Sequence, residues 1–144
     1  MYRVSLTEHS LLIRSTTDNL DKVRAFVEKH AAAASFPPAA VENVKMAVDE
    51  ACANVIEHAY GNETGHVIEI SILTFDDRLV VRLRDQGKKF DQTTYEEPDL
   101  ATFVRQKKSG GFGVHLMRKL MDEVEYRHLD GQNETLLIKY RDAS

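Results

Sequence analysis

Four strand-like segments constrain the fold most, because they fall into two pairs that are each joined by a short turn. The segments cover residues 67–73, 79–84, 124–128 and 135–140, and all except 124–128 are rich in Val, Ile and Leu. Asp76-Asp77 separates the first pair and Asp130-Gly131 the second, and both are residues that favour tight turns. Strands joined by short turns pair in antiparallel fashion. We therefore expect a largely antiparallel sheet.

A further strand and a helix are predicted at the start of the chain. Residues 10–15 are short, apolar and compatible with β-structure. Thr17 or Asp18 is expected to cap the helix that follows, because their side-chain oxygens can accept from free amides of a first helical turn. Apolar residues then recur with helical spacing at Leu20, Val23, Phe26 and Val27. We expect this helix to end in the alanine run at residues 31–34.

Two more helices complete the pattern. Pro37 or Pro38 suits the first turn of the second helix, where a missing N–H costs nothing. Its apolar face is formed by Val41, Val44, Val48, Ala51, Cys52 and Val55. The third helix is expected to open near Gly113. The order β-α-α-β-β-α-β-β predicts an α+β fold, a two-layer sandwich with helices on one face of the sheet.

Length and composition fit a single globular domain spanning residues 1–144. The chain is 42% hydrophobic and 29% charged, and its net charge of -4 argues against nucleic-acid binding. Cys52 is the single cysteine, so no internal disulfide can form. Residues 1–9 lack an apolar signal core, and no run approaches the roughly 20 apolar residues of a membrane helix. We expect a cytoplasmic protein.

An acidic and an amide residue lie one turn apart on the second helix. At about 100° per residue, Glu50 and Asn54 point away from its apolar face. An amide oxygen can bind Mg²⁺, and a nearby carboxylate can accept a proton from an attacking hydroxyl. Taken alone, the pair also fits a solvated helix face. Glu57 is interpreted as solvated, and His58 as hydrogen-bonded rather than as a metal ligand.

A second polar group directly follows a strand, in the sequence Asp85-Gln86-Gly87. The carboxylate of Asp85 can accept from an exocyclic amine such as that of adenine. Gly87 allows the backbone to approach the ring closely. By itself this group also fits an ordinary turn at a strand end.

The third group, Gly110-Gly111-Phe112-Gly113, precedes a helix. Free amides at a helix N-terminus favour phosphate oxygens, and Lys107 and Lys108 just upstream can neutralise phosphate charge or remain solvated. The sequence matches neither a Walker loop nor a dinucleotide fingerprint. Cys52 is interpreted as an inert core thiol, because it falls on the apolar helix face.

Taken together, these groups resemble a known family, the anti-sigma factor serine kinases. These kinases belong to the gyrase, chaperone and histidine-kinase ATPase superfamily, which has the Bergerat ATP-binding fold. Residues 49–60 look like its asparagine box and residues 85–91 like its first glycine box. Residues 111–117, followed by 121–126, look like the second glycine box, and residues 131–135 resemble its closing turn.

The resemblance implies a role for each matching residue. Glu50 would be the general base, Asn54 would bind Mg²⁺, and Asp85 would accept from the adenine amine of ATP. The remaining nucleotide-binding residues would be Gly87, Lys108, Gly111, Gly113 and Thr135, and residues 92–110 would form an ATP lid. Lys108 departs from the family pattern, which often has arginine there, and lysine lacks the bidentate fork.

The resemblance also implies a function. The protein would be an ATP-dependent protein-serine kinase that phosphorylates an anti-sigma antagonist, binds a sigma factor and often forms a homodimer. An alternative is an ATP-gated protein-binding module without kinase activity, because nucleotide binding and phosphoryl transfer share all these residues except Glu50. The catalytic domain of a histidine kinase is a third interpretation, against which the Glu57-His58-Ala59-Tyr60 ending counts.

Overall fold

The computed structural model describes residues 6–88 and 111–141, and side chains from residue 116 onward in the second range. Its strands are β1 (Thr7–Arg14), β2 (Val67–Thr74), β3 (Arg78–Asp85), β4 (Glu123–Leu129) and β5 (Gln132–Tyr140). Its helices are the 3₁₀ turn η1 (Thr17–Asn19), α1 (Leu20–Ala33), α2 (Pro38–Asn54), the π-helical turn η2 (Val55–Ala59) and α4 (Gly111–Leu120). The predicted order of strands and helices is confirmed.

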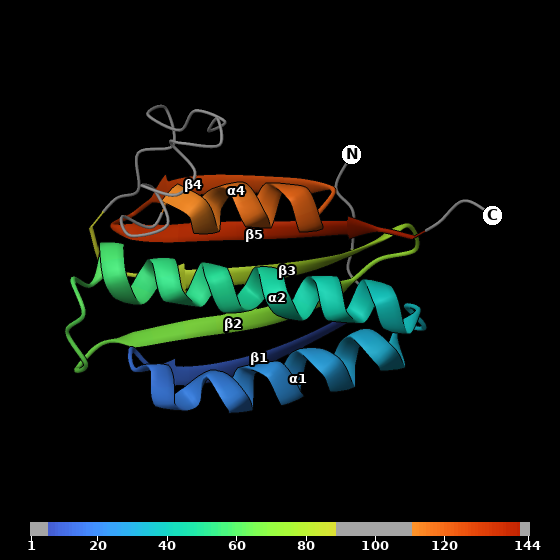
Figure 1. The fold of residues 1–144 in the computed structure, drawn as a ribbon, viewed down its shortest axis with the longest axis horizontal. Coiled ribbons are helices and arrows are strands. Elements are labelled where there is room, and N and C mark those ends of the chain that lie inside the picture. Colours follow the sequence, from blue (N-terminus) through green and yellow to red (C-terminus); the bar gives the residue numbers. More distant parts are fainter. Residues whose placement is uncertain (1–5, 89–110, 142–144) are drawn as a thin grey trace.

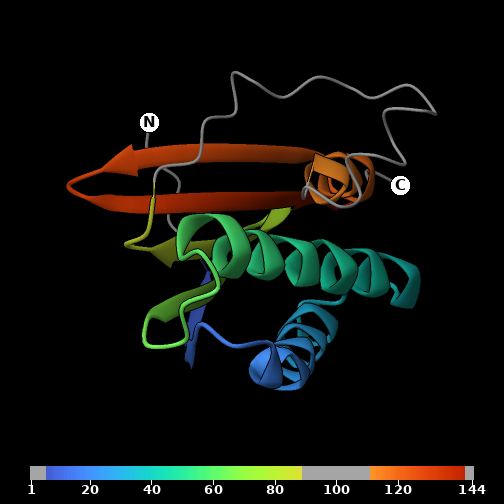
Figure 2. The ribbon, with the colours of Figure 1, turned by 60° about the vertical axis from the view of Figure 1, so that its left-hand side comes forward.

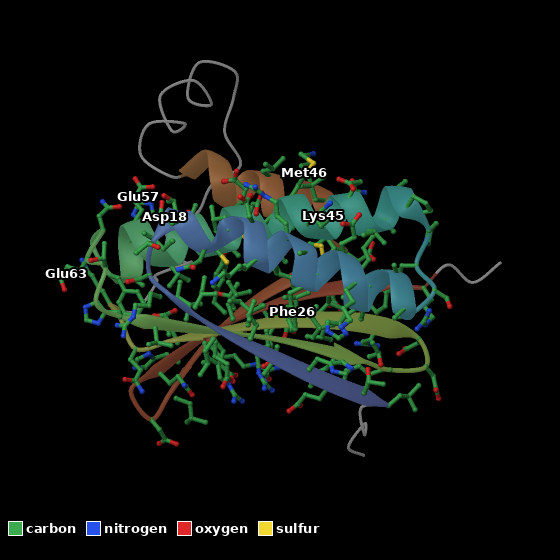
Figure 3. All side chains as sticks on the ribbon, turned by 90° about the horizontal axis from the view of Figure 1, so that it is seen from below. Asp18, Phe26, Lys45, Met46, Glu57 and Glu63 are labelled. Atoms are coloured by element: carbon green, nitrogen blue, oxygen red, sulfur yellow. The ribbon has the colours of Figure 1, made fainter. Side chains whose placement is uncertain are left out.

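The strands form a five-stranded sheet in the order β1-β2-β3-β5-β4, and every neighbouring pair is antiparallel. The helices α1, α2 and α4 all cover one face of this sheet (Figures 1 and 3). The helix α2 packs against both α1 and α4 (Figure 2). The predicted two-layer α+β sandwich is therefore confirmed.

The core lies between the helices and the covered face of the sheet. Along β2, Ile68, Ile70 and Ile72 are fully buried, because alternate residues of a strand point to the same face. Val44 and Val48 of α2 pack against this face and are 1% exposed. Burying one such side chain contributes about 1.5–3 kcal/mol, so this face fixes the register of the sheet.

The local signals for turns and helix starts are mostly confirmed. The helix α2 begins at Pro38, and Asp130 and Gly131 join β4 to β5 with φ values of 55° and 74°. Positive φ at both central residues matches the right-handed twist of a hairpin. The predicted cap of α1 is wrong. Thr17 and Asp18 lie inside η1, and Asn19 at the cap position makes no side-chain cap hydrogen bond.

The reason for this difference is a 3₁₀ turn between β1 and α1, which moves the helix start beyond both predicted caps. The amide Nδ2 of Asn19 instead donates back to the Arg14 carbonyl at 3.4 Å and to Thr16 Oγ1 at 3.2 Å. The expected lid at 92–110, with Lys107 and Lys108, lies outside the described residues. Among residues 6–88 and 111–141, no helix is long and apolar enough to cross a membrane.

Candidate functional site

The elements that carry the described members of the predicted site come together at one end of the sandwich (Figure 1). Figure 1 shows the end of α2, the end of β3 and the start of β5 together at the left, where α4 also begins. Register explains part of this, because Asp85 at the end of β3 is paired with Asn133 of β5. The antiparallel sheet thus brings together segments that are far apart in the sequence.

Glu50 lies on α2 and is half-buried, as its predicted position away from the core face requires. Burial raises the pKa of its carboxyl, and the negative charge of neighbouring Asp49 adds to this rise. Asp49 is held in turn by Arg24 of α1, whose Nε donates to Asp49 Oδ2 at 2.7 Å. A carboxyl whose pKa is raised toward the working pH is a more effective general base. This environment is compatible with the proton transfer that the family resemblance implies for Glu50.

Asn54 is the last residue of α2, one turn beyond Glu50 and directly before the π-helical turn η2. Its Nδ2 atom is buried, and within the described part of the chain no acceptor lies within hydrogen-bonding distance. Buried polar atoms are rarely left without a partner, so such an atom suggests a site built for a ligand. The amide oxygen of the same side chain fits Mg²⁺, which takes few protein oxygens and keeps several waters.

Asp85 is 3% exposed at the end of β3. Its Oδ1 atom accepts from the Gly87 amide at 2.9 Å and from Asn133 Nδ2 at 2.8 Å. Burial raises the pKa of this carboxyl, while these hydrogen bonds and His128 oppose the rise. Both of these hydrogen bonds from described residues to the Asp85 carboxylate go to Oδ1. The other oxygen, Oδ2, can therefore accept from a ligand.

Gly87 is required here by the packing of the protein itself. A Cβ atom at this position would lie 2.4 Å from the Ala59 carbonyl oxygen and 2.6 Å from its carbon. The same carbonyl accepts from the Lys88 amide at 2.7 Å. The turn after β3 is therefore pressed against η2, which joins the Asp85 segment to the helix of Glu50 and Asn54.

Tyr60 strengthens this junction and was not predicted as a site residue. Its hydroxyl donates to the Val67 carbonyl at 2.7 Å and accepts from the Gln86 amide at 2.9 Å. Its ring stacks on His66 with centroids 4.4 Å apart. Burial raises the pKa of Tyr60. The signal in the sequence is its position at the end of the 49–60 motif, but its partners depend on the fold.

Asn133 is the other site residue that was not predicted. It is 7% exposed, and its Nδ2 lies close to three acceptors on the Asp85–Lys88 turn. Thr135 lies two residues further along β5 and is also 7% exposed, on the same face of the sheet. The predicted Thr135 is thus near the Asp85 end of the sheet, as the closing-turn resemblance implies.

The remaining predicted residues lie on α4, α2 and η2. Gly111 and Gly113 lie in the first turn of α4, so this helix begins slightly before the predicted start near Gly113. Cys52 is fully buried and its pKa is raised to about 12, which fits the predicted inert thiol. Glu57 and His58 are exposed on η2. Residues 6–88 and 111–141 hold no group of three His, Cys, Asp or Glu side chains arranged to bind a metal.

Comparisons with known proteins identify the family. Residues 13–139 match the family described as the histidine kinase-like ATPase domain. The chain is 38% identical to serine-protein kinase RsbW of Bacillus velezensis over 96 residues, which cover 63% of this chain and 59% of that protein. It is 32% identical to serine-protein kinase RsbW of Listeria monocytogenes over 76% of this chain and 72% of that protein.

Solved structures show the same fold. The RsbU and RsbW domains of Rv1364c from Mycobacterium tuberculosis match with a TM-score of 0.65 and 16% identity, over 92% of this chain and 31% of that chain. The SiaB–SiaC complex from Pseudomonas aeruginosa matches with a TM-score of 0.56 and 13% identity, over 91% of this chain and 89% of that chain. At this identity, the two likenesses concern the fold alone.

The matched length limits what these relatives say about activity. The chain spans 59% of the length of the Bacillus velezensis and Bacillus subtilis proteins that it resembles. Family membership does not depend on that length, because the family match covers almost the whole described chain. The chain therefore belongs to the histidine kinase-like ATPase domain family, and it is similar to proteins named serine-protein kinase RsbW.

Proposed function

We propose that this protein is an ATP-dependent protein-serine kinase of the partner-switching type. Its substrate would be a serine on an anti-sigma antagonist, and it would also bind a sigma factor. The observation that carries the proposal is the position of Glu50 and Asn54, one turn apart on α2, at the same end of the sandwich as the buried Asp85. The relatives named serine-protein kinase support the same activity.

The nucleotide would bind at this end of the sandwich. Oδ2 of Asp85 would accept from the adenine amine, with Gly87 and Thr135 beside the base. The backbone amides of Gly111 and Gly113, in the first turn of α4, would bind phosphate oxygens. Lys108 would add positive charge nearby. Asn54 would bind Mg²⁺, which supplies charge neutralisation at the phosphates.

The chemical step would transfer the γ-phosphoryl group to the serine. A bond forms between the serine hydroxyl oxygen and the γ-phosphorus, and the bond from that phosphorus to the β–γ bridging oxygen breaks. The proton of the hydroxyl moves to Glu50, and ADP leaves with the bridging oxygen. Most of the rate would come from positioning and charge neutralisation, as is general for phosphoryl transfer.

The partner switch would follow from the same reaction. The unphosphorylated antagonist competes with the sigma factor for this protein, and its phosphorylation ends that competition. We expect the protein to act as a homodimer in the cytoplasm. Its net charge of -4 fits protein partners better than nucleic acid.

Glu50→Gln tests the proposed base. The change keeps the side-chain shape but removes the proton acceptor, so phosphorylation of the antagonist should fall by about 10²–10⁴-fold. ATP affinity and the midpoint of urea unfolding should stay near wild type. Transfer of radiolabel from ATP to the purified antagonist measures phosphorylation, and calorimetric titration measures ATP affinity. A variant with wild-type kinase activity would contradict the role of Glu50.

The alternative of an ATP-gated binding module predicts a different pattern. If wild type binds ATP but labels no antagonist, and Glu50→Gln still regulates its target in cells, the kinase proposal fails and the gated module is favoured. A pH profile adds a further check. Because the pKa of Glu50 is raised above its ordinary value, the acid limb of the kinase rate should lie above pH 4.5. This limb should be absent from the residual rate of Glu50→Gln.

A further inference from the structure

A row of three polar side chains crosses the sheet at the proposed base-binding end. Asp85 of β3 is paired with Asn133 of β5, and Asn133 is paired with His128 of β4. All three therefore lie on the face of the sheet that carries the helices. Asp85 and Asn133 are 3% and 7% exposed, so their hydrogen bonds form with little competition from water.

The orientation of the Asn133 amide follows from its neighbours. Nδ2 lies 2.8 Å from Asp85 Oδ1, and 3.1 Å from both the Gly87 and the Lys88 carbonyl oxygens. These are all acceptors, so the nitrogen of the amide must face them and share its two protons among them. The amide oxygen then faces His128, whose Nδ1 lies 2.8 Å away and must donate.

This arrangement determines what Asp85 can offer to a ligand. The Asn133 amide and the Gly87 amide both donate to Oδ1, which fixes the carboxylate plane and favours its ionised form. With respect to the described residues, Oδ2 then remains as a fixed acceptor. A fixed acceptor fits the 6-amino group of a purine and repels the oxygen of a 6-oxopurine.

We infer that Asn133 is a positioning residue for nucleobase selection, which holds Asp85 so that a 6-aminopurine nucleotide is chosen over a 6-oxopurine nucleotide. The inference rests on the proposed function, because it takes the nucleotide to bind at Asp85. Asn133 acts through Asp85 and need not touch the base. The Asn133 amide also donates to the Gly87 and Lys88 carbonyls, and these contacts hold the turn after β3 at a second point.

The test compares ATP with inosine triphosphate, which has a 6-oxo group in place of the 6-amino group. Wild type should prefer ATP. Asn133→Leu removes the donor to Asp85 while keeping a similar volume, and should reduce the ratio of the two affinities by about tenfold or more. If Asn133→Leu only disturbed the structure, it would weaken the binding of both nucleotides equally and leave the ratio unchanged. Asn43→Leu is the matched control, because it makes the same exchange about three helical turns before Asn54 on α2 and should leave the ratio within about twofold.

Asn133→Asp provides a second readout that does not depend on how well the leucine variant folds. Two carboxylates would then face each other, and like charges at this distance cannot both ionise easily. One shared proton restores a donor to Asp85, so the ATP affinity of this variant should rise as pH is lowered from 8.5 to 6. Within the described chain, the titratable groups that face Asp85 are Tyr60 and His128. Both are also present in wild type and in Asn133→Leu, so any pH dependence of ATP affinity that they cause should appear in those two proteins as well.

The outcomes separate the inference from the proposed function. The inference is supported if Asn133→Leu has a reduced ratio of ATP affinity to inosine triphosphate affinity and the ATP affinity of Asn133→Asp rises at low pH. If Asn133→Leu does not fold, the pH dependence of ATP affinity in Asn133→Asp decides. If folded variants keep the wild-type ratio and pH profile while wild type prefers ATP, the inference is overturned and the proposed function survives. If wild type binds neither nucleotide, both are overturned.

Discussion

At the scale of single residues, Gly87 shows how a site residue can be fixed by packing before any ligand is considered. Its Cα faces the Ala59 backbone so closely that a Cβ would lie 2.4 Å from the carbonyl oxygen. The Lys88 amide donates to that same oxygen at 2.7 Å. The glycine therefore sets the distance between the Asp85 turn and the end of η2.

Gly87→Ala should destabilise the protein, because the atoms in the way belong to the backbone and cannot rotate aside. We expect a loss of about 1–3 kcal/mol in the free energy of unfolding. Urea denaturation followed by circular dichroism measures it. Gly65→Ala is the control, because nothing lies within 4 Å of its added Cβ. Equal midpoints for the two variants would contradict the packing role of Gly87.

At the scale of elements, α2 carries side chains that pack in the core and side chains that are proposed to bind a ligand. Val48 is 1% exposed in the core, whereas Asn54 ends the helix with a buried Nδ2 that no described residue satisfies. Replacing the first removes packing, while replacing the second removes an unsatisfied donor. Stability and ligand binding should therefore separate along one helix.

Val48→Asp should unfold the domain, because an unpaired charge would enter the core and cost more than about 4 kcal/mol. Asn54→Ala should change the free energy of unfolding by less than about 1 kcal/mol, since it removes a donor that forms no hydrogen bond with any described residue. It should weaken Mg²⁺-ATP binding by about tenfold or more. Thermal melts and calorimetric titration measure the two effects. Unfolding of Asn54→Ala as severe as that of Val48→Asp would refute its role as a ligand.

Periodicity predicted the elements well but not their junctions. The apolar spacing of α2 and the turn at Asp130-Gly131 are local signals, and both appear in the structure as expected. The π-helical turn η2 leaves no such signal in the apolar spacing of the sequence. Local spacing also missed the 3₁₀ turn that displaced the predicted cap of α1.

The candidate site divides in the same way. Glu50, Asn54 and Asp85 were identified from residue type, spacing and family resemblance. Asn133 was not, because its importance comes from the register that pairs β5 with the end of β3. The pairing of β5 with the end of β3 cannot be recognised as a local pattern in a single sequence. Residues whose role is to hold another residue are therefore the ones that sequence reasoning misses.

At the scale of the whole molecule, we expect the contact between α1 and the β1 edge of the sheet to depend on pH. The His9 and His30 rings stack with centroids 4.0 Å apart, and Phe26 packs edge-on against His30 at 4.8 Å. Burial lowers the pKa of His30, and the neighbouring His9 and Lys29 lower it further. The folded state therefore resists a proton that the unfolded chain accepts.

The sign of the pH dependence follows from linkage. Below pH about 6.5 the unfolded state binds more protons at His30 than the folded state, so the free energy of unfolding should fall as the pH drops. The raised pKa values of Glu50 and Asp85 act in the opposite direction at lower pH. Urea midpoints between pH 7.5 and 5.5 measure the effect. His30→Gln should flatten the curve, whereas the exposed His58→Gln should not; equal curves for wild type and His30→Gln would count against the assignment.

The central claim is that the end of the sandwich where α2, β3 and β5 meet binds Mg²⁺-ATP. Calorimetric titration of ATP, with and without Mg²⁺, into wild type and Asp85→Asn tests it most directly. We predict magnesium-assisted binding by wild type and a loss of about a hundredfold or more in Asp85→Asn, because the amide presents a donor or a weaker acceptor to the adenine amine. Failure of wild type to bind ATP, or equal binding by Asp85→Asn, would contradict the claim.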